Sequence, residues 1–169
     1  MKSNDLLLDA FGRIHEAVAA VLEGSDGGSL LHRPAGSGNS IAWLIWHLSR
    51  IEDSQVASAA GLDQVWTSQG FAGRFNLKLP DRDTGYGHST DQVDAVHGTP
   101  ELLLAYYDAV HQQTVEFLKT LGDDDFDRIV DYHWDPPVTL GVRLVSTIAD
   151  CLQHVGQAAY AKGLNPGSA

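Results

Sequence analysis

An aspartate, a histidine and a glutamine recur at helical spacing in one otherwise apolar segment of the chain, Ser146 to Tyr160. Each residue of an α-helix turns by about 100°, so Asp150 and His154 stand one turn apart on the same face, and Gln157 continues the line. A second histidine, His47, occurs inside another apolar run, where full hydration of an imidazole is not expected. These residues could converge if both segments are helices that face each other.

A carboxylate and an imidazole one turn apart, together with a ligand from a facing helix, are the side chains from which helix bundles build metal sites. A divalent cation held by His47, Asp150 and His154 would keep coordination positions open, as catalytic sites do. Zinc is the first expectation, and the same ligands also suit nickel, manganese or ferrous iron. Taken alone the spacing is a weak signal, because an aspartate and a histidine four residues apart on a helix often occur by chance, and without a metal these residues would form a buried hydrogen-bond network.

Four segments have the periodicity of amphipathic helices, with apolar residues three and four positions apart. They are residues 4–22, 41–60, 100–121 and 140–162. Asn39 or Ser40, Thr99 and Thr139 are expected to cap the second, third and fourth helices at their N-termini. Gly61, Gly122 and Gly163 are expected to end the second, third and fourth helices.

These segments predict an all-α protein, a four-helix bundle. The one strand-like run, "RIVDYHW", is too little for a sheet, because a single short strand has no hydrogen-bonding partner. Residues 62–98 form a long connection between the second and third helices, and loops of this length in compact domains are usually functional. Such a connection can cross the length of the bundle, so the second and third helices could run parallel.

The composition is that of a single domain, residues 1–169. The chain has 22 acidic and 11 basic residues and a net charge of −11, which repels phosphate backbones, so no nucleic-acid partner is expected. The longest apolar run, Ile41 to Trp46, is far shorter than the roughly 20 residues of a membrane-spanning helix. The N-terminal segment has the pattern of an amphipathic helix rather than a signal peptide, and the chain has a single cysteine. A cytoplasmic protein is therefore expected.

The chain resembles the DinB-like superfamily, and more closely its branch of mycothiol-dependent transferases and isomerases. Three stretches carry the resemblance: "NSIAWLIWHLSRIED", "DTGYGHS" and "WDPPVTLGVRLVSTIADCLQHVGQAAYAKGL". The resemblance implies a four-helix bundle with a crossed-over connection between its second and third helices. It also implies a metal bound by His47 of the second helix and by Asp150 and His154 of the fourth. Aspartate is shorter than the glutamate of the branch's isomerase, so binding by Asp150 directly or through a water stays open.

The same resemblance implies that a low-molecular-weight thiol, mycothiol or an analogue, is bound by the metal as a thiolate and attacks a small electrophile. Coordination would make the nucleophile at neutral pH, because a free thiol has a pKa of about 8.5. One alternative is a non-enzymatic stress-response bundle that binds a metal or a small ligand. Another is a metal-dependent hydrolase, in which water takes the open position. The apolar faces could also pair two copies into a homodimer.

Other residues near these stripes have two possible roles each. Arg50 and Arg143 could hold a substrate carboxylate, or they could be surface salt-bridge partners of Glu52, Asp53 or Asp150. His88, in the long connection, is a candidate general base or substrate contact, whereas many loop histidines are simply hydrated. Cys151 is expected to be packed rather than nucleophilic, with a thiol pKa raised by the neighbouring Asp150.

Overall fold

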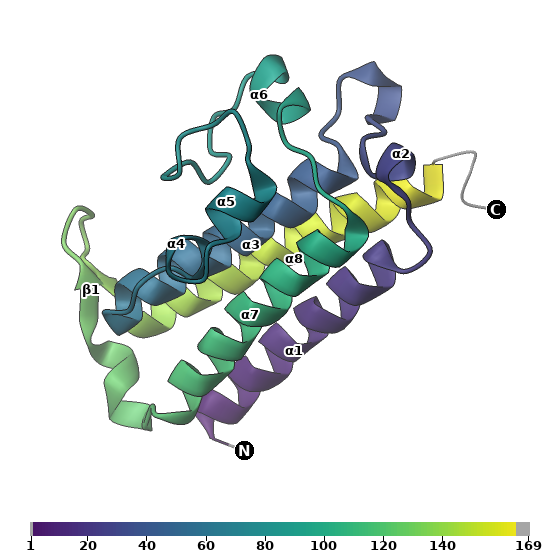
Figure 1. The fold of residues 1–169 in the computed structure, drawn as a ribbon. Coiled ribbons are helices and arrows are strands. Elements are labelled where there is room, and N and C mark those ends of the chain that lie inside the picture. The colour runs from purple at the N-terminus through teal and green to yellow at the C-terminus, as the bar shows by residue number, and fades with distance from the viewer. Residues whose placement is uncertain (1, 165–169) are drawn as a thin grey trace.

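Four long helices form a bundle (Figure 1). The computed structural model describes residues 2–164 of the chain. The bundle helices are α1 (Ser3–Leu22), α3 (Ile41–Ala60), α7 (Pro100–Lys119) and α8 (Leu140–Leu164). The predicted all-α four-helix fold is therefore confirmed, and each predicted helix agrees with an observed one to within two residues at either end.

Side-chain caps determine where three of these helices begin. The hydroxyls of Ser40, Thr99 and Thr139 each accept a hydrogen bond from the backbone N–H three residues later, at 3.2, 3.2 and 3.3 Å. These bonds satisfy N–H groups that have no partner within the first turn of a helix. Helix α3 ends at Gly61, whose φ of 69° is in the left-handed region that glycine adopts without strain. The expected caps at Thr99 and Thr139 and the expected end at Gly61 are confirmed, and Ser40 rather than Asn39 caps α3. The ends expected at Gly122 and Gly163 were wrong, because α7 ends at Lys119 and α8 continues to Leu164.

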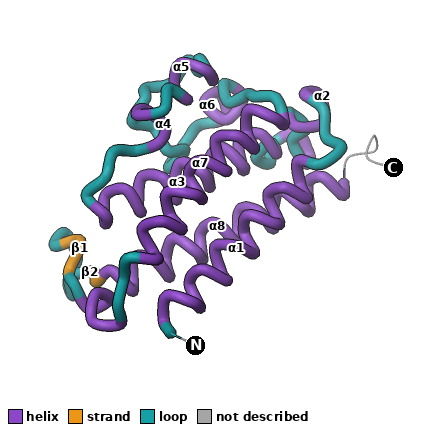
Figure 2. The backbone as a smooth tube through the Cα atoms, turned by 60° about the horizontal axis from the view of Figure 1, so that its bottom comes forward, coloured by secondary structure: helices purple, strands orange, loops and turns teal. Residues whose placement is uncertain are grey.

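Helices α3 and α7 run parallel, as the long connection between them allows. Arg50 of α3 contacts Tyr106 of α7, and further along both helices Gln113 donates a hydrogen bond to the carbonyl of Asp63. Helices α1 and α8 also run parallel to each other, because Lys162 near the end of α8 donates to carbonyls at the end of α1. Figure 2 shows the bundle from a second direction, with the connection on one side of it.

The connection between α3 and α7 contains three short helices that the sequence analysis did not anticipate. They are α4 (Val65–Ser68), α5 (Phe71–Phe75) and α6 (Thr90–Asp94). Helices of four or five residues are too short to show a period in the sequence. Trp66, Phe71 and Phe75 pack against Tyr106, with ring centroids 5.2, 5.0 and 5.9 Å away. These contacts dock the connection onto the bundle.

The segment before α8 corrects one expectation. Strand β1 (Ile129–Asp131) pairs antiparallel with β2 (Val138–Thr139), so the strand-like run does have a partner. The partner was missed because it is only two residues long and directly precedes a helix. Three further short elements complete the described chain: α2 (Gly27–Leu30), η1 (Pro34–Gly36) and η2 (Asp123–Asp127). No helix within residues 2–164 is long and apolar enough to cross a membrane.

Two buried acidic side chains of α3, Glu52 and Asp53, have a raised pKa, and the larger rise is that of Glu52. Glu52 on α3 is fully buried, and the Tyr107 hydroxyl of α7 donates a hydrogen bond to its Oε2 at 2.9 Å. Burial, opposed only in part by hydrogen bonds, raises the pKa of Glu52 from 4.5 to about 7. Folding therefore increases the proton affinity of this carboxyl. Its contribution to stability must decline as pH rises from the unfolded pKa through the folded one.

We predict that Glu52→Gln removes this decline, because glutamine keeps the hydrogen-bond acceptor and cannot ionise. The variant and the wild type should have similar free energies of unfolding at about pH 4, and the variant should be more stable by up to about 3 kcal/mol at about pH 8. Urea unfolding across this pH range measures the difference. Glu116→Gln, at an exposed position of α7, is the control and should show no pH-dependent difference. A constant gap between Glu52→Gln and the wild type at all pH values would contradict the assignment.

Candidate metal centre

Three side chains that can bind a metal ion meet between α3 and α8. One ligand atom each from His47, Asp150 and His154 lies within 4.8 Å of the other two. The carboxylate of Asp150 faces both imidazoles, with Oδ2 3.9 Å from His47 Nε2 and Oδ1 3.7 Å from His154 Nε2, and the two rings contact each other edge to face with centroids 4.5 Å apart. The three residues that the sequence analysis selected therefore do converge.

The hydrogen bond of His47 determines which of its nitrogens faces the cluster. Its Nδ1 contacts the carbonyl oxygen of Thr84, which can only accept, so Nδ1 carries the proton. The lone pair is then on Nε2, the atom that faces Asp150. The Trp43 indole stacks on the same imidazole, with ring centroids 4.6 Å apart and planes 13° from parallel. His47 is thus fixed in the tautomer and orientation of a metal ligand.

His154 is held in the same way by a neighbour on its own helix. The side-chain oxygen of Gln157 lies 3.0 Å from His154 Nδ1 and accepts a hydrogen bond from it. The Nε2 atom is left free on the side of Asp150. This accounts for the third polar residue of the stripe on α8: Gln157 orients a ligand and is not one itself.

The cluster fits a divalent cation on the chemistry of its own atoms. Oδ2 of Asp150 is buried and has no hydrogen-bond partner among residues 2–164. Such an atom is costly unless something satisfies it, and a cation would do so. Burial, opposed in part by the hydrogen bond to Thr84, lowers the pKa of His47. The imidazole is therefore neutral near pH 7, which is the form that binds metals.

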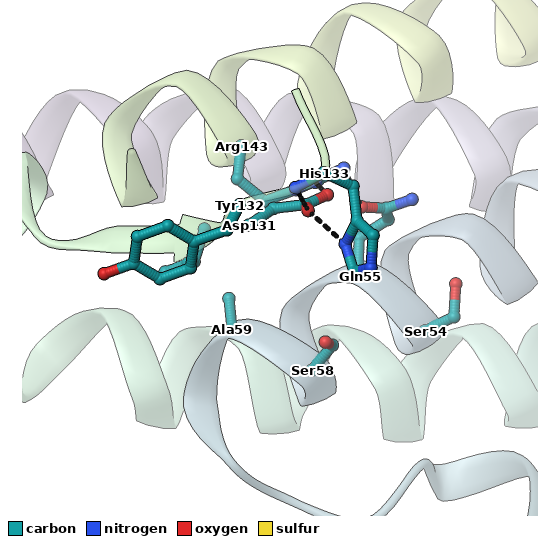
Figure 3. A pocket seen from close by; sticks show the side chains of 9 residues that line it. Ser54, Gln55, Ser58, Ala59, Asp131, Tyr132, His133 and Arg143 are labelled. Carbon is teal, nitrogen blue, oxygen red and sulfur yellow. Dashed lines mark hydrogen bonds and ion pairs between the residues drawn. The ribbon is translucent and has the colours of Figure 1, made fainter. Parts of the chain in front are cut away.

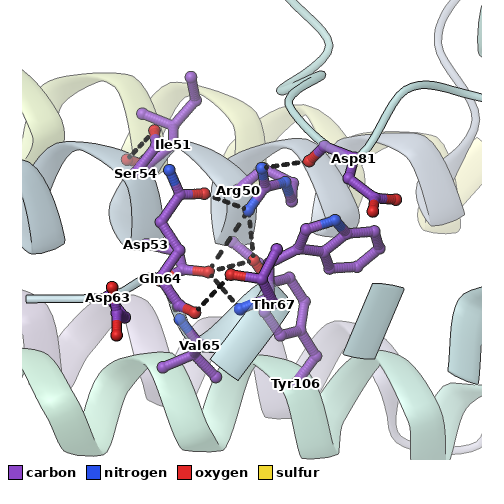
Figure 4. A network of polar contacts seen from close by, with 12 residues as sticks. Arg50, Ile51, Asp53, Ser54, Asp63, Gln64, Val65, Thr67, Asp81 and Tyr106 are labelled. Carbon is purple, nitrogen blue, oxygen red and sulfur yellow. Dashed lines mark hydrogen bonds and ion pairs between the residues drawn. The ribbon is translucent and has the colours of Figure 1, made fainter. Parts of the chain in front are cut away.

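Arg50 lies fully buried beneath the connection between α3 and α7 (Figure 4). Its Nε and Nη2 each donate a 3.1 Å hydrogen bond, to the carbonyls of Asp83 and Asp81. Its Nη1 donates to Gln64 at 2.9 Å and lies 3.4 Å from a carboxylate oxygen of Asp53. All three guanidinium nitrogens are engaged within the protein. Holding a substrate carboxylate, the role suggested from the sequence, does not fit this position. The alternative of a surface salt bridge agrees in its partner, Asp53, but not in its location, because both side chains are buried.

The position of Arg50 nevertheless matters for the cluster. The carbonyls that it holds belong to residues 81 and 83, and the next carbonyl, that of Thr84, accepts the hydrogen bond from His47. Asp53 fixes another part of the same connection, since its two carboxylate oxygens accept from the N–H groups of residues 65 and 66 at 2.8 Å. The buried Arg50–Asp53 pair therefore holds in place the segment that orients His47.

Gly85 lies directly against His47, closer than any other residue type would allow. A Cβ atom at this position would be 2.6 Å from His47 Nδ1 and 3.0 Å from the Trp43 ring. The φ of Gly85 is +97°, a conformation that L side chains rarely adopt. Sequence analysis assigned no role to Thr84 or Gly85. The available signal was the "DTGYGHS" stretch, where two glycines flank a tyrosine in a loop.

Arg143 lies away from the cluster, at a cavity of about 460 Å³ between α3 and the β1–β2 hairpin (Figure 3). Its Nη2 donates to Asp131 at 2.6 Å and its Nη1 donates to Gln55 at 2.5 Å. Arg143 precedes Asp150 by seven residues, which is two turns or about 10 Å along the same face of α8. The cavity and the cluster thus lie on one seam between α3 and α8.

His88 is not one of the three ligands, although it lies near enough for its charge to lower the pKa of His47. The His88 side chain is 4% exposed, its Nδ1 accepts a hydrogen bond from the Trp43 indole at 3.1 Å, and its ring stacks on Trp46. The alternative of a simply hydrated loop histidine is also excluded by this burial.

Cys151 is packed as expected, and its pKa is raised mainly by burial and further by the charges of Glu52 and Asp150.

Comparison with known proteins identifies a family to which the chain is similar. The model of the DinB superfamily matches residues 10–158. A conserved protein from Enterococcus faecalis, known from its crystal structure, is 32% identical to the chain, with a TM-score of 0.87 and 95% of each chain covered. No curated protein matches the chain.

We predict that Gly85→Ala weakens binding of a divalent cation by about tenfold or more, because the new methyl group must displace the His47 imidazole. Isothermal titration with zinc, after treatment with a chelator, measures the affinity. Gly87→Ala is a matched control: Gly87 also has a positive φ, +71°, but a Cβ there meets nothing within 4 Å. Equal losses in the two variants would assign the effect to backbone strain and not to the contact with His47.

Proposed function

The chain belongs to the DinB superfamily, and we propose that it is a metal-dependent enzyme that transfers a low-molecular-weight thiol to a small electrophile. Mycothiol or a similar thiol is the proposed cosubstrate, and zinc is the proposed metal. The observation that carries the proposal is the ligand set itself: two imidazoles oriented by hydrogen bonds and one carboxylate.

Asp150 is the most exposed of the three ligand residues, although its Oδ2 atom is buried. The side chains of His47 and His154 are 6% and 19% exposed, whereas that of Asp150 is 38% exposed. Three protein ligands leave at least one position of a tetrahedral cation for another molecule, which is typical of catalytic sites and not of structural ones. This favours an enzyme over a bundle that only stores or buffers a metal.

A divalent cation at this site would supply Lewis acidity that lowers the pKa of a bound thiol, which is otherwise about 8.5. The chain's own residues would hold the site in place: Thr84 and Gln157 keep both Nδ1 atoms protonated, and Trp43 covers one face of His47. A thiol activated in this way needs no separate general base from the protein. His88, the candidate general base, is already occupied by its contacts with Trp43 and Trp46, and the proposed mechanism does not need it.

The cavity at Arg143 is a candidate location for the body of the thiol or of the electrophile. It lies two turns from the cluster on α8, and Ser54 on its α3 side follows His47 by seven residues, again two turns. Asp131 neutralises the charge of Arg143. The lining of the cavity offers hydroxyl and amide groups from Ser54, Gln55 and Ser58. Such a lining suits a neutral, polar molecule better than a carboxylate.

We predict that the wild-type protein, purified without an affinity tag, contains about one equivalent of divalent metal, and that His154→Ala contains little, because two ligands rarely retain a metal against buffer. Mass spectrometry of the metal content is the measurement. His133→Ala is the control, since the His133 side chain is 96% exposed and outside the cluster. Absence of metal from the wild type, with no uptake of added zinc or nickel, would rule out the metalloenzyme.

Thiol binding is tested separately on protein loaded with cobalt(II), whose absorption spectrum changes when sulfur enters its coordination sphere. A small thiol should produce a new sulfur-to-cobalt band, because Asp150's side of the cluster is accessible. The same titration with His154→Ala should produce no such band. A wild type that binds cobalt, shows no band with any thiol and hydrolyses an activated ester would instead support a hydrolase.

A further inference from the structure

Trp43 packs on both imidazoles of the candidate metal centre. Its indole lies nearly parallel to the His47 ring, and it stands edge-on to the His154 ring, with centroids 6.2 Å apart and planes at 86°. Both separations are within the range of interacting aromatic pairs. Thr84 and Gln157 fix the two imidazoles one at a time, each through its own Nδ1 atom. The indole is in contact with both rings, so its position affects how the two ligand nitrogens lie relative to each other.

The Trp43 indole is held in this position by its N–H group. Nε1 of Trp43 donates a 3.1 Å hydrogen bond to Nδ1 of His88. Because an indole N–H only donates, Nδ1 of His88 is the unprotonated nitrogen and the proton of the neutral imidazole is on Nε2. The other buried tryptophans of residues 2–164, Trp46 and Trp66, have Nε1 atoms without a hydrogen-bond partner. The indole that packs on the ligands is thus the one whose orientation a hydrogen bond fixes.

His88 is itself held by the protein on its other sides. Its ring stacks on Trp46, with centroids 5.9 Å apart and planes 23° from parallel, and its Nε2 lies 3.4 Å from Oδ2 of Asp83. Its backbone N–H donates to the carbonyl of Gly85 at 3.2 Å, which closes the turn that contains Gly85. With a side chain only 4% exposed, His88 has little freedom to move. It is therefore a fixed acceptor for the N–H of Trp43.

We propose that His88 is a positioning residue of the metal centre that acts through Trp43. By accepting the indole N–H, His88 holds the ring that packs on His47 and His154, and so sets the arrangement of the two ligand nitrogens. This role takes the place of general-base catalysis, because the nitrogen that could accept a proton is engaged and the ring is shielded from solvent. The inference rests on the metal binding of the proposed function, and it is independent of the thiol and of the electrophile.

Calorimetric zinc titration of chelator-treated protein tests the proposal, together with the absorption spectrum of bound cobalt(II), which reports coordination geometry. His88→Phe keeps a ring against Trp46 and removes the acceptor. It should weaken zinc binding about tenfold or more and shift the cobalt bands, since outer partners of metal-binding histidines typically contribute this much. His88→Asn keeps an acceptor oxygen near the position of Nδ1, so its affinity and spectrum should match those of the wild type. His97→Phe, at an exposed position of the same connection, is the control and should also match.

A double-mutant cycle separates action through Trp43 from a general loss of structure. Trp43→Phe keeps a ring on His47 and removes the N–H donor, so it should weaken zinc binding about as much as His88→Phe does. The double variant should lose no more than either single variant, because both remove the same interaction. Circular dichroism and thermal unfolding without metal establish that each variant is folded.

Three results would overturn the proposal. They are wild-type zinc affinity and an unchanged cobalt spectrum in His88→Phe, a His88→Asn variant as weak as His88→Phe, and losses that add in the double variant. Each of these results leaves the metal site and the proposed function in place. A wild type that takes up neither zinc nor cobalt would instead rule out the metal site, and with it both the proposed function and the role of His88.

Discussion

The arrangement of the candidate metal centre depends on one buried guanidinium. Arg50 is on α3, one turn from His47, and it binds two carbonyls of the connection that passes over that helix. Its charge is compensated by Asp53, which also caps the start of α4. Removing a charge from water is costly unless every donor finds an acceptor, so the connection has little freedom to adopt another path. The hydrogen bonds of Arg50 thereby position the Thr84 carbonyl against His47, although Arg50 itself does not contact the cluster.

Both the bundle helices and the connection between α3 and α7 are needed to position the cluster. The antiparallel helices α3 and α8 bring the ligand atoms of His47, Asp150 and His154 to within 4.8 Å. Helices alone would leave the ring orientation of His47 undetermined, because an imidazole can turn about its bond to Cβ. The connection supplies the missing constraint through Thr84 and the close approach of Gly85, and Gln157 supplies it for His154. Outer hydrogen bonds of this kind raise the basicity of the ligands and fix their tautomers.

Helix α8 presents different side chains on three faces. Its innermost face carries apolar side chains and Cys151 into the core, and the edge next to α3 carries Asp150 and His154. The outer face carries exposed, uncharged side chains. Because these faces are set by the 3.6-residue period, a change on one of them can leave the other two intact.

Periodicity and terminal caps, both local properties, were sufficient to predict the four long helices, their ends at Ser40, Gly61, Thr99 and Thr139, and the shared face of Asp150 and His154. The position of His47 inside an apolar run made it a candidate for the same site, and the resemblance to the family implied the same three residues. The path of the connection came only from the tertiary structure, because its short helices have no period and are held by contacts distant in sequence. Those long-range contacts turned Arg50 and His88 inward and brought Thr84 and Gly85 against His47, and they left Arg143 at a separate cavity. Local sequence therefore determined which residues could be ligands, and packing across the connection decided what surrounds them.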